Sequence, residues 1–131
     1  HALRTLVKQG NPRSLRLVGF DPDVAVEAAL NVPSACKIGD LLAFDAVLKG
    51  PPNAAVLVDY VIDFVKADGS TAPKVFKLKQ AKLGTDGTLP IKKAHRFKGD
   101  ATRFRLYPGR HTLSLQINGV RRVRAEFELT L

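Results

Sequence analysis

The 131 residues suffice for one domain that buries a hydrophobic core without metals or disulfides. Hydrophobic side chains make up 45% of the chain and charged side chains 25%, a composition typical of a soluble globular protein. No apolar run approaches the roughly 20 residues needed to cross a bilayer, so we expect no membrane segment.

The start of the chain and its cysteine content bear on the cellular compartment of the protein. The first ten residues carry basic side chains inside a helical pattern and do not resemble a signal peptide. A start at His1 rather than methionine suggests a piece of a longer chain. Cys36 is the single cysteine, so no internal disulfide forms, which favours a reducing, cytoplasmic location and a small buried thiol.

The net charge of +9 is unevenly distributed along the sequence. Residues 21–65 hold two basic and seven acidic side chains, whereas residues 66–125 hold fifteen basic and three acidic ones. A block this basic attracts polyanions, nucleic acid first among them. A lysine-rich solubilising surface explains the same composition, so charge alone leaves both interpretations open.

The first twenty residues have the pattern of two short helices. Leu3, Leu6 and Val7 form one apolar stripe at helical spacing, and Asn11-Pro12 supplies an N-cap and a first-turn proline for a second helix. We therefore predict a helical segment over residues 1–20. Helices this short are marginal alone, so we expect them to pack on the following domain or on residues outside this chain.

From Asp21 onward the hydrophobic period changes from 3.6 to 2. Seven strands are predicted, at residues 24–32, 41–49, 55–66, 74–83, 88–98, 110–118 and 120–131. Seven short strands separated by turn residues are typical of a Greek-key sandwich. We predict an all-β, seven-stranded antiparallel sandwich, immunoglobulin- or fibronectin-like, over residues 21–131. The antibody-type core is excluded because tryptophan and a second cysteine are absent.

Local patterns refine this fold prediction. In the third predicted strand the hydrophobic side chains would face inward, with Asp59 and Asp63 facing water. Asn118-Gly119 predicts a type I′ hairpin turn between the last two strands. Tyr107, at the start of the sixth strand, is a corner tyrosine whose hydroxyl we expect to tie the loop to the sheet.

The sequence lacks patterns for catalysis, a metal or a cofactor. The three histidines are not at metal-ligand spacing, and no phosphate-binding glycine motif or nucleophile elbow is present. Asp59/Asp63 and Glu126/Glu128 are carboxylate pairs at strand spacing, and we interpret them as the solvated face of a sheet. We predict no cofactor, and an independent enzyme would require a pocket with two carboxylates or a metal.

Basic stretches are the stronger functional candidates. On a strand, Lys93 and His95 share one face, whereas Lys92 and Arg96 share the other, so these cations do not form one patch. Arg103 and Arg105 lie in a loop, where a guanidinium can bind phosphate in a fork geometry. Three further arginines, at positions 121, 122 and 124, follow the hairpin turn. Phosphate binding and the protection of edge strands by solvated charges both remain possible uses.

Two segments resemble a known family. HALRTLVKQGNPRSLRLVGF resembles the last helical pair of HEAT-like-repeat bacterial DNA glycosylases that excise alkylated purines such as 3-methyladenine. KKAHRFKGDATRFRLYPGRHTLSLQING resembles the C-terminal immunoglobulin-like domain of one subgroup. The resemblance implies a whole enzyme whose HEAT-like array grips alkylated DNA and holds the catalytic carboxylate, with the sandwich completing the grip. Its catalytic part lies outside these residues, so we expect no base excision by this fragment.

The resemblance and the basic stretches together give a predicted DNA-contacting set. Its members are Lys93, His95, Arg103, Arg105 and His111 in the sandwich, and His1, Arg4 and Lys8 on one face of the helical segment. The expected partners are double-stranded DNA and the HEAT-like domain of the same protein. The alternative is a protein-interaction or structural module without a nucleic-acid role. One positive ridge would favour DNA, and evenly scattered charges would favour the alternative.

Overall fold

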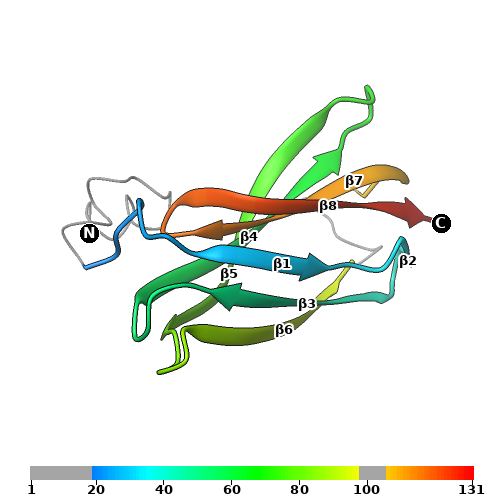
Figure 1. Cartoon of the computed structure of the whole chain (residues 1–131). Helices are drawn as coiled ribbons and strands as arrows, with labels where there is room; N and C mark the ends of the chain where they lie inside the picture. The colour runs from blue at the N-terminus through cyan, green and yellow to red at the C-terminus, as the bar shows by residue number, and fades with distance from the viewer. Residues whose placement is uncertain (1–18, 98–105) are drawn as a thin grey trace.

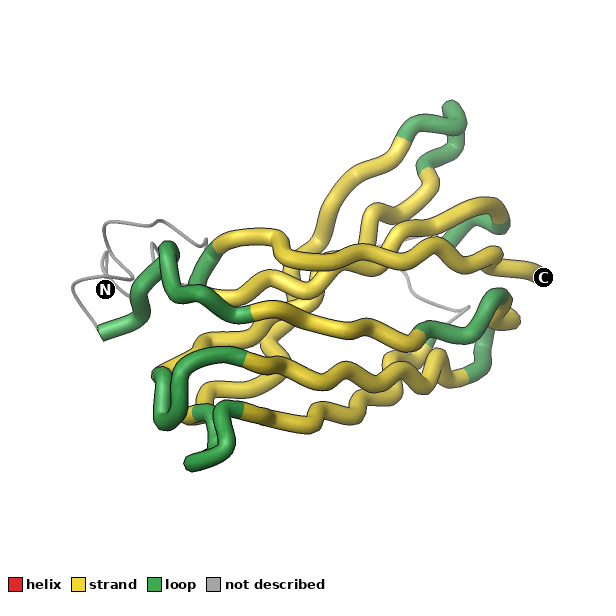
Figure 2. Tube along the Cα trace, in the orientation of Figure 1, coloured by secondary structure: helices red, strands yellow, loops and turns green. Residues whose placement is uncertain are grey.

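The computed structural model describes residues 19–97 and 106–131, which form strands, turns and loops (Figure 2). The predicted helices, and with them His1, Arg4 and Lys8, lie outside the described residues, as does the loop that carries Arg103 and Arg105. The boundary predicted after residue 20 therefore stays a prediction. No helix that is long and apolar enough to span a membrane occurs within the described residues.

Eight strands form two sheets in the described residues (Figure 1). The strands are β1 (Glu27–Asn31), β2 (Ala35–Lys37), β3 (Leu41–Lys49), β4 (Ala55–Val65), β5 (Thr71–Lys82), β6 (Thr88–Arg96), β7 (Gly109–Ile117) and β8 (Val120–Thr130). One sheet has the order β1-β3-β6 and the other β2-β8-β7-β4-β5. The prediction of an all-β sandwich is confirmed.

The structure has one strand more than the seven predicted. The additional strand, β2, has three residues and pairs parallel to β8, whereas the other pairs are antiparallel. Three residues are too few to show an alternating pattern, so only the turns around this strand are visible in the sequence. Its inward-facing residue is Cys36, which is buried as expected. Burial, and then the charge of Asp40, raise the pKa of this thiol, which keeps it protonated.

The core lies between the two sheets and follows the predicted alternation. In β3, buried and exposed residues alternate strictly, with Leu42, Phe44, Ala46 and Leu48 inside. The inward residues of β7 and β8 add Leu113, Leu115, Ile117, Phe127 and Leu129. Buried and partly buried side chains of all eight strands contribute to this core, so it draws on residues from β1 to β8.

In β4 the alternation fails, and the prediction that Asp59 faces water is wrong. Asp59 is only 3% exposed, although it lies on the outward face of the five-stranded sheet. Its strand is flanked on both sides, and the residues opposite it, Lys77 and Gln116, have long side chains that shield it from solvent. Asp63, nearer the end of β4, is half-buried and lies 3.8 Å from Arg121.

Replacing Asp59 by asparagine is expected to stabilise the domain at neutral pH. Burial raises the pKa of Asp59 to about 6, against 3.8 for a free carboxyl, and the charge of Lys77 offsets part of this. The folded state therefore holds the proton more tightly than the unfolded state, and stability falls as the pH rises from about 4 to 6. Urea unfolding should show a gain of about 1–3 kcal/mol at pH 7 and little gain at pH 3.5. Asp63→Asn is the control. An equal gain in both variants would contradict the view that burial of the Asp59 carboxyl is the cause.

The β7–β8 turn also anchors the segment that leads into the sandwich. Asn118 and Gly119 both have positive φ, at 50° and 82°, as the predicted hairpin turn requires. The buried Asn118 amide donates to the carbonyl of Asp21 at 2.8 Å and accepts from the amide of Leu57 at 2.8 Å. These bonds join the hairpin turn, β4 and the chain before β1 in one network.

Candidate nucleic-acid interface

The two edge strands β5 and β6 carry a concentrated positive charge. They contain seven basic residues and no acidic residue, and each forms one border of its sheet. We call this set the basic edge, and its members are Lys74, Lys77, Lys79, Lys82, Lys92, Lys93 and Arg96. These cations share the two border strands but not one face, because Lys93 is opposite buried Phe44, whereas Lys92 and Arg96 are opposite the exposed residues Asp45 and Leu41.

Aromatic contacts show that β5 and β6 lie on the same side of the molecule. The ring centroids of Phe76 in β5 and His95 in β6 are 4.7 Å apart, although the two strands belong to different sheets. Behind them, Tyr60 of β4 stacks on Phe76 with centroids 5.0 Å apart. The open border of the sandwich is therefore filled by rings and rimmed by lysines.

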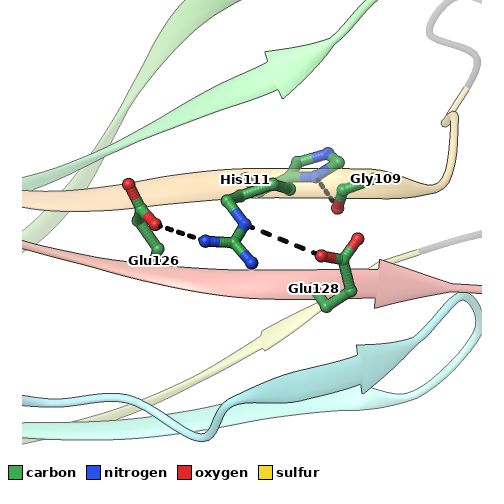
Figure 3. A network of polar contacts seen from close by, with 5 residues as sticks. Gly109, His111, Glu126 and Glu128 are labelled. Carbon is green, nitrogen blue, oxygen red and sulfur yellow. Dashed lines mark hydrogen bonds and ion pairs between the residues drawn. The ribbon is translucent and has the colours of Figure 1, made fainter.

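The arginines of β7 and β8 are used differently. Arg110 lies between Glu126 and Glu128, with N···O distances of 3.0 and 3.8 Å (Figure 3). Arg122 donates to the carbonyls of Pro22 and Val24 at 2.8 and 3.0 Å. Within the arginine cluster that follows the hairpin turn, Arg122 is therefore engaged in internal contacts, and Arg121 lies 3.8 Å from Asp63.

Of the residues predicted to contact DNA, Lys93 belongs to the basic edge, and His95 lies on the same strand, β6. Lys93 is exposed, whereas His95 is half-buried, with its Nδ1 2.8 Å from the hydroxyl of Tyr60. Burial, and to a smaller extent the nearby charges of Lys93 and Lys74, lower the pKa of His95 to about 4. His95 is therefore neutral at physiological pH, and its protonation destabilises the fold as the pH falls from 6.5 towards 4.

His111 occupies a different place from the other predicted contact residues. It has no accessible surface, and Figure 3 shows its ring beside the carbonyl of Gly109, which lies 3.0 Å from Nδ1. Nε2 accepts a hydrogen bond from the amide of Val65 at 3.4 Å. Burial lowers its pKa, so the imidazole is neutral. His111 is thus not part of the accessible basic edge, and it ties the corner in the way that the sequence predicted for Tyr107.

Sequence reasoning did not assign the four lysines of β5. Their signal was present, since the strand has four lysines and no acidic residue in twelve positions. The strand order cannot be read from the sequence. It places β5 at the border of the five-stranded sheet, beside β6, rather than between two other strands. Lysine is also the residue that keeps exposed strand edges from pairing with other chains, so these side chains protect the edge whatever else they bind.

The described residues contain little that suggests catalysis or metal binding. In residues 19–97 and 106–131, no group of three or more histidines, cysteines and carboxylates could hold a metal ion. An open hollow of about 390 Å³ lies over β3 and β6, lined by Ala43, Phe44, Asp45, Lys92, Lys93 and Ala94. Asp45 is its single carboxylate, so this hollow does not provide a pair of acid and base groups.

The two-sheet arrangement is that of an immunoglobulin-like domain. The chain belongs to the family of the C-terminal Ig-like domain of the uncharacterised protein YhaZ, whose model matches residues 26–131. The uncharacterised protein YhaZ of Bacillus subtilis is 33% identical to it over 131 residues, which are 98% of this chain and 36% of the relative.

Solved structures extend the comparison. The structure of Pseudomonas fluorescens alkylpurine DNA glycosylase AlkC, bound to DNA containing an abasic site analog, matches the whole chain with 38% identity and a TM-score of 0.89. The match covers 37% of that chain, so these residues span about a third of the length of both relatives. A β-glucosidase from Listeria innocua matches 83% of the chain and 16% of its own, at 14% identity and a TM-score of 0.64, and shares the fold alone.

Proposed function

We propose that this domain is a DNA-binding accessory module of a cytoplasmic bacterial DNA alkylation-repair glycosylase. The observation that carries the proposal is the 38% identity over the whole chain with part of a glycosylase bound to DNA. In the proposed whole protein, a preceding HEAT-like domain holds the catalytic group, and this domain excises no base itself. The basic edge supplies the charge that a DNA-binding surface needs.

The chemistry of the basic edge favours contact with the phosphate backbone of double-stranded DNA. Six of its seven cations are lysines, whose ammonium groups attract phosphates as point charges and carry little base specificity. Lys93 and His95 belong to the proposed contact surface, together with Arg103, Arg105, His1, Arg4 and Lys8 from the predicted set. We expect binding that is independent of sequence and strongly dependent on salt.

Binding of the 131-residue chain to a fluorescent duplex, followed by anisotropy at several salt concentrations, tests this proposal. The dissociation constant should lie at about 10⁻⁴ to 10⁻⁶ M, and its logarithm should change by about 0.9 per neutralised phosphate with the logarithm of salt concentration. The triple variant Lys77→Gln, Lys79→Gln, Lys82→Gln should reduce that slope by about 2 to 3 and the affinity at least about tenfold.

A matched control shows whether the loss of DNA binding depends on the position of the lysines or only on the net charge of the chain. The variant Lys37→Gln, Lys49→Gln, Lys66→Gln removes the same charge from positions outside β5 and β6. It should retain most of the affinity and slope. Equal losses in both variants would mean that only the net charge matters, and the basic edge would not be the binding surface.

A second candidate function, protein contact, rests on the outward face of the three-stranded sheet. Ala29, Val47 and Pro90 form one exposed row across β1, β3 and β6, and Leu41 on the same face is 50% exposed. Flat apolar patches mark protein interfaces, and the relatives contain a further two thirds of chain that such a face could contact. Slower hydrogen exchange in β3 of a full-length relative than in the fragment would support this; equal exchange would count against it.

A further inference from the structure

Some residues are buried on the outward face of the five-stranded sheet, outside the core. Val61 of β4 has no accessible surface, although its neighbours Tyr60 and Ile62 are the ones that point into the core. Because successive side chains on a strand point to opposite faces, Val61 points outward. It is paired with Val75 of β5 and with Ser114 of β7, and Ser114 is only 2% exposed. A second buried layer therefore lies outside the space between the sheets.

The side chains directly beside Val61 are too short to bury it. Val75 and Ser114 are small, and Val75 is itself 42% exposed. Along β4 the next outward residues, Asp59 and Asp63, are also short. The three-stranded sheet lies on the opposite, core side, so no described strand covers this face. A valine in these surroundings would keep part of its surface in water, and its complete burial indicates that the face is covered.

The chain before β1 comes close to this face. Asn118 donates to the carbonyl of Asp21 and accepts from the amide of Leu57, in both cases at 2.8 Å. Leu57 precedes Val61 by four residues on β4, which is about 13 Å along the strand. Phe20, next to Asp21, is 8% exposed and is likewise buried outside the core. In Figure 1 the described chain begins at the end of the sandwich where β7 turns into β8, so the preceding residues enter beside β4.

Residues 1–18, which we call the leading segment, match this face in length and chemistry. As predicted helices they would span up to about 27 Å, which exceeds the distance along β4. Their apolar stripe of Leu3, Leu6 and Val7 needs a partner, because helices this short are marginal alone. The segment has four basic residues and no acidic residue. The face holds the buried carboxyl of Asp59, whose burial costs less free energy beside an opposite charge.

We propose that the leading segment docks on the outward face of the five-stranded sheet, with its apolar stripe over Val61 and Ser114. The sequence leaves two partners open for this segment, the following domain and residues outside this chain. The buried outward face favours the following domain. The docked segment covers β4 and β7, between β5 on one side and β8 on the other. This docking goes beyond the proposed function and does not require DNA binding.

A soluble paramagnetic agent tests the docking in the 131-residue chain, because it speeds the NMR relaxation of methyl groups that solvent reaches. The methyl groups of Val61 should relax as slowly as those of Val58, a core valine on the same strand, whereas those of Val75 should relax fast. In the variant Leu3→Gln, Leu6→Gln, which interrupts the apolar stripe, the relaxation of Val61 should rise to the level of Val75. Val58 should stay protected, because the core is unchanged.

A matched control carries the same two glutamines away from the stripe. The variant Ala2→Gln, Thr5→Gln should leave Val61 protected, since positions 2 and 5 lie on other sides of the predicted helix. In the unsubstituted chain, nuclear Overhauser contacts between the methyl groups of Val61 and Leu6 test the docking without a variant. Their presence supports it and their absence overturns it, even if the stripe variant does not fold.

Other results would also overturn the docking. Val61 relaxing like Val75 in the unsubstituted chain would show that the face is open to water. Val61 staying protected in the stripe variant would show that something other than the leading segment covers it. Protection that increases with protein concentration would show that a second copy of the chain occupies the face.

Discussion

Replacing Asn118 by alanine is expected to lower the free energy of unfolding by about 3–5 kcal/mol. The buried amide donates to the carbonyls of Asp21 and Ala55 and accepts from the amide of Leu57. Alanine removes these three hydrogen bonds, and each buried polar group that is left unsatisfied costs about 1–3 kcal/mol. Alanine also disfavours the φ of 50° found here, at about 1 kcal/mol. Urea unfolding at pH 7 measures the loss.

Two further variants divide the effect between backbone and hydrogen bonds. Asn118→Gly accommodates the positive φ but lacks the amide, so it should recover only about 1 kcal/mol relative to alanine. Asn118→Asp keeps the acceptor for Leu57 and turns an oxygen towards the carbonyls of Asp21 and Ala55, which is repulsive. It should remain strongly destabilised. A glycine variant as stable as the native protein would show that the network contributes nothing.

Gly87→Ala is the second substitution expected to have a large effect. A Cβ at this position would overlap the carbonyl oxygen of Gly50, and the φ of +76° already disfavours a side chain. The contact is with backbone, and the two residues are also joined by a 2.8 Å hydrogen bond from the Gly50 amide to the Gly87 carbonyl. The turns before β4 and before β6 must therefore separate, and we expect a loss of about 4 kcal/mol.

Gly69→Ala is the matched control for this substitution. Gly69 has a similar φ of +86°, but a Cβ there would meet nothing within 4 Å. Its cost should be that of the backbone conformation alone, about 1–2 kcal/mol. Circular dichroism and urea unfolding of the two variants compare them directly. Equal losses would show that the turns near Gly50 and Gly87 move apart freely, against the close packing seen in the structure.

Much of the fold could be predicted because local patterns determine it. The strict alternation in β3, and the Asn118-Gly119 turn, follow from side-chain spacing and φ preference. Strand β2 could not be predicted, because three residues carry no period. The burial of Asp59 could not be predicted either, since it depends on Lys77 and Gln116 from neighbouring strands, and a strand's own sequence does not identify its neighbours.

The kinds of residue that form the candidate site could be predicted from the sequence, but their arrangement in the fold could not. The sequence showed a basic second half, and the predicted contact residues included Lys93 of the basic edge and His95 on the same strand. It did not show that β5 adds four lysines beside them, because that depends on two sheets ending on the same side. Nor could it show that Arg122 binds backbone carbonyls about a hundred positions earlier in the chain.

We propose that DNA binds along the border formed by β5 and β6. Amide chemical-shift perturbation on titration with a short duplex tests it most directly, because every described strand reports separately. We expect the largest perturbations at residues 71–82 and 88–96, fading as salt is added. Perturbations confined to β1, β2 and β8, or equal changes over all strands, would contradict the claim.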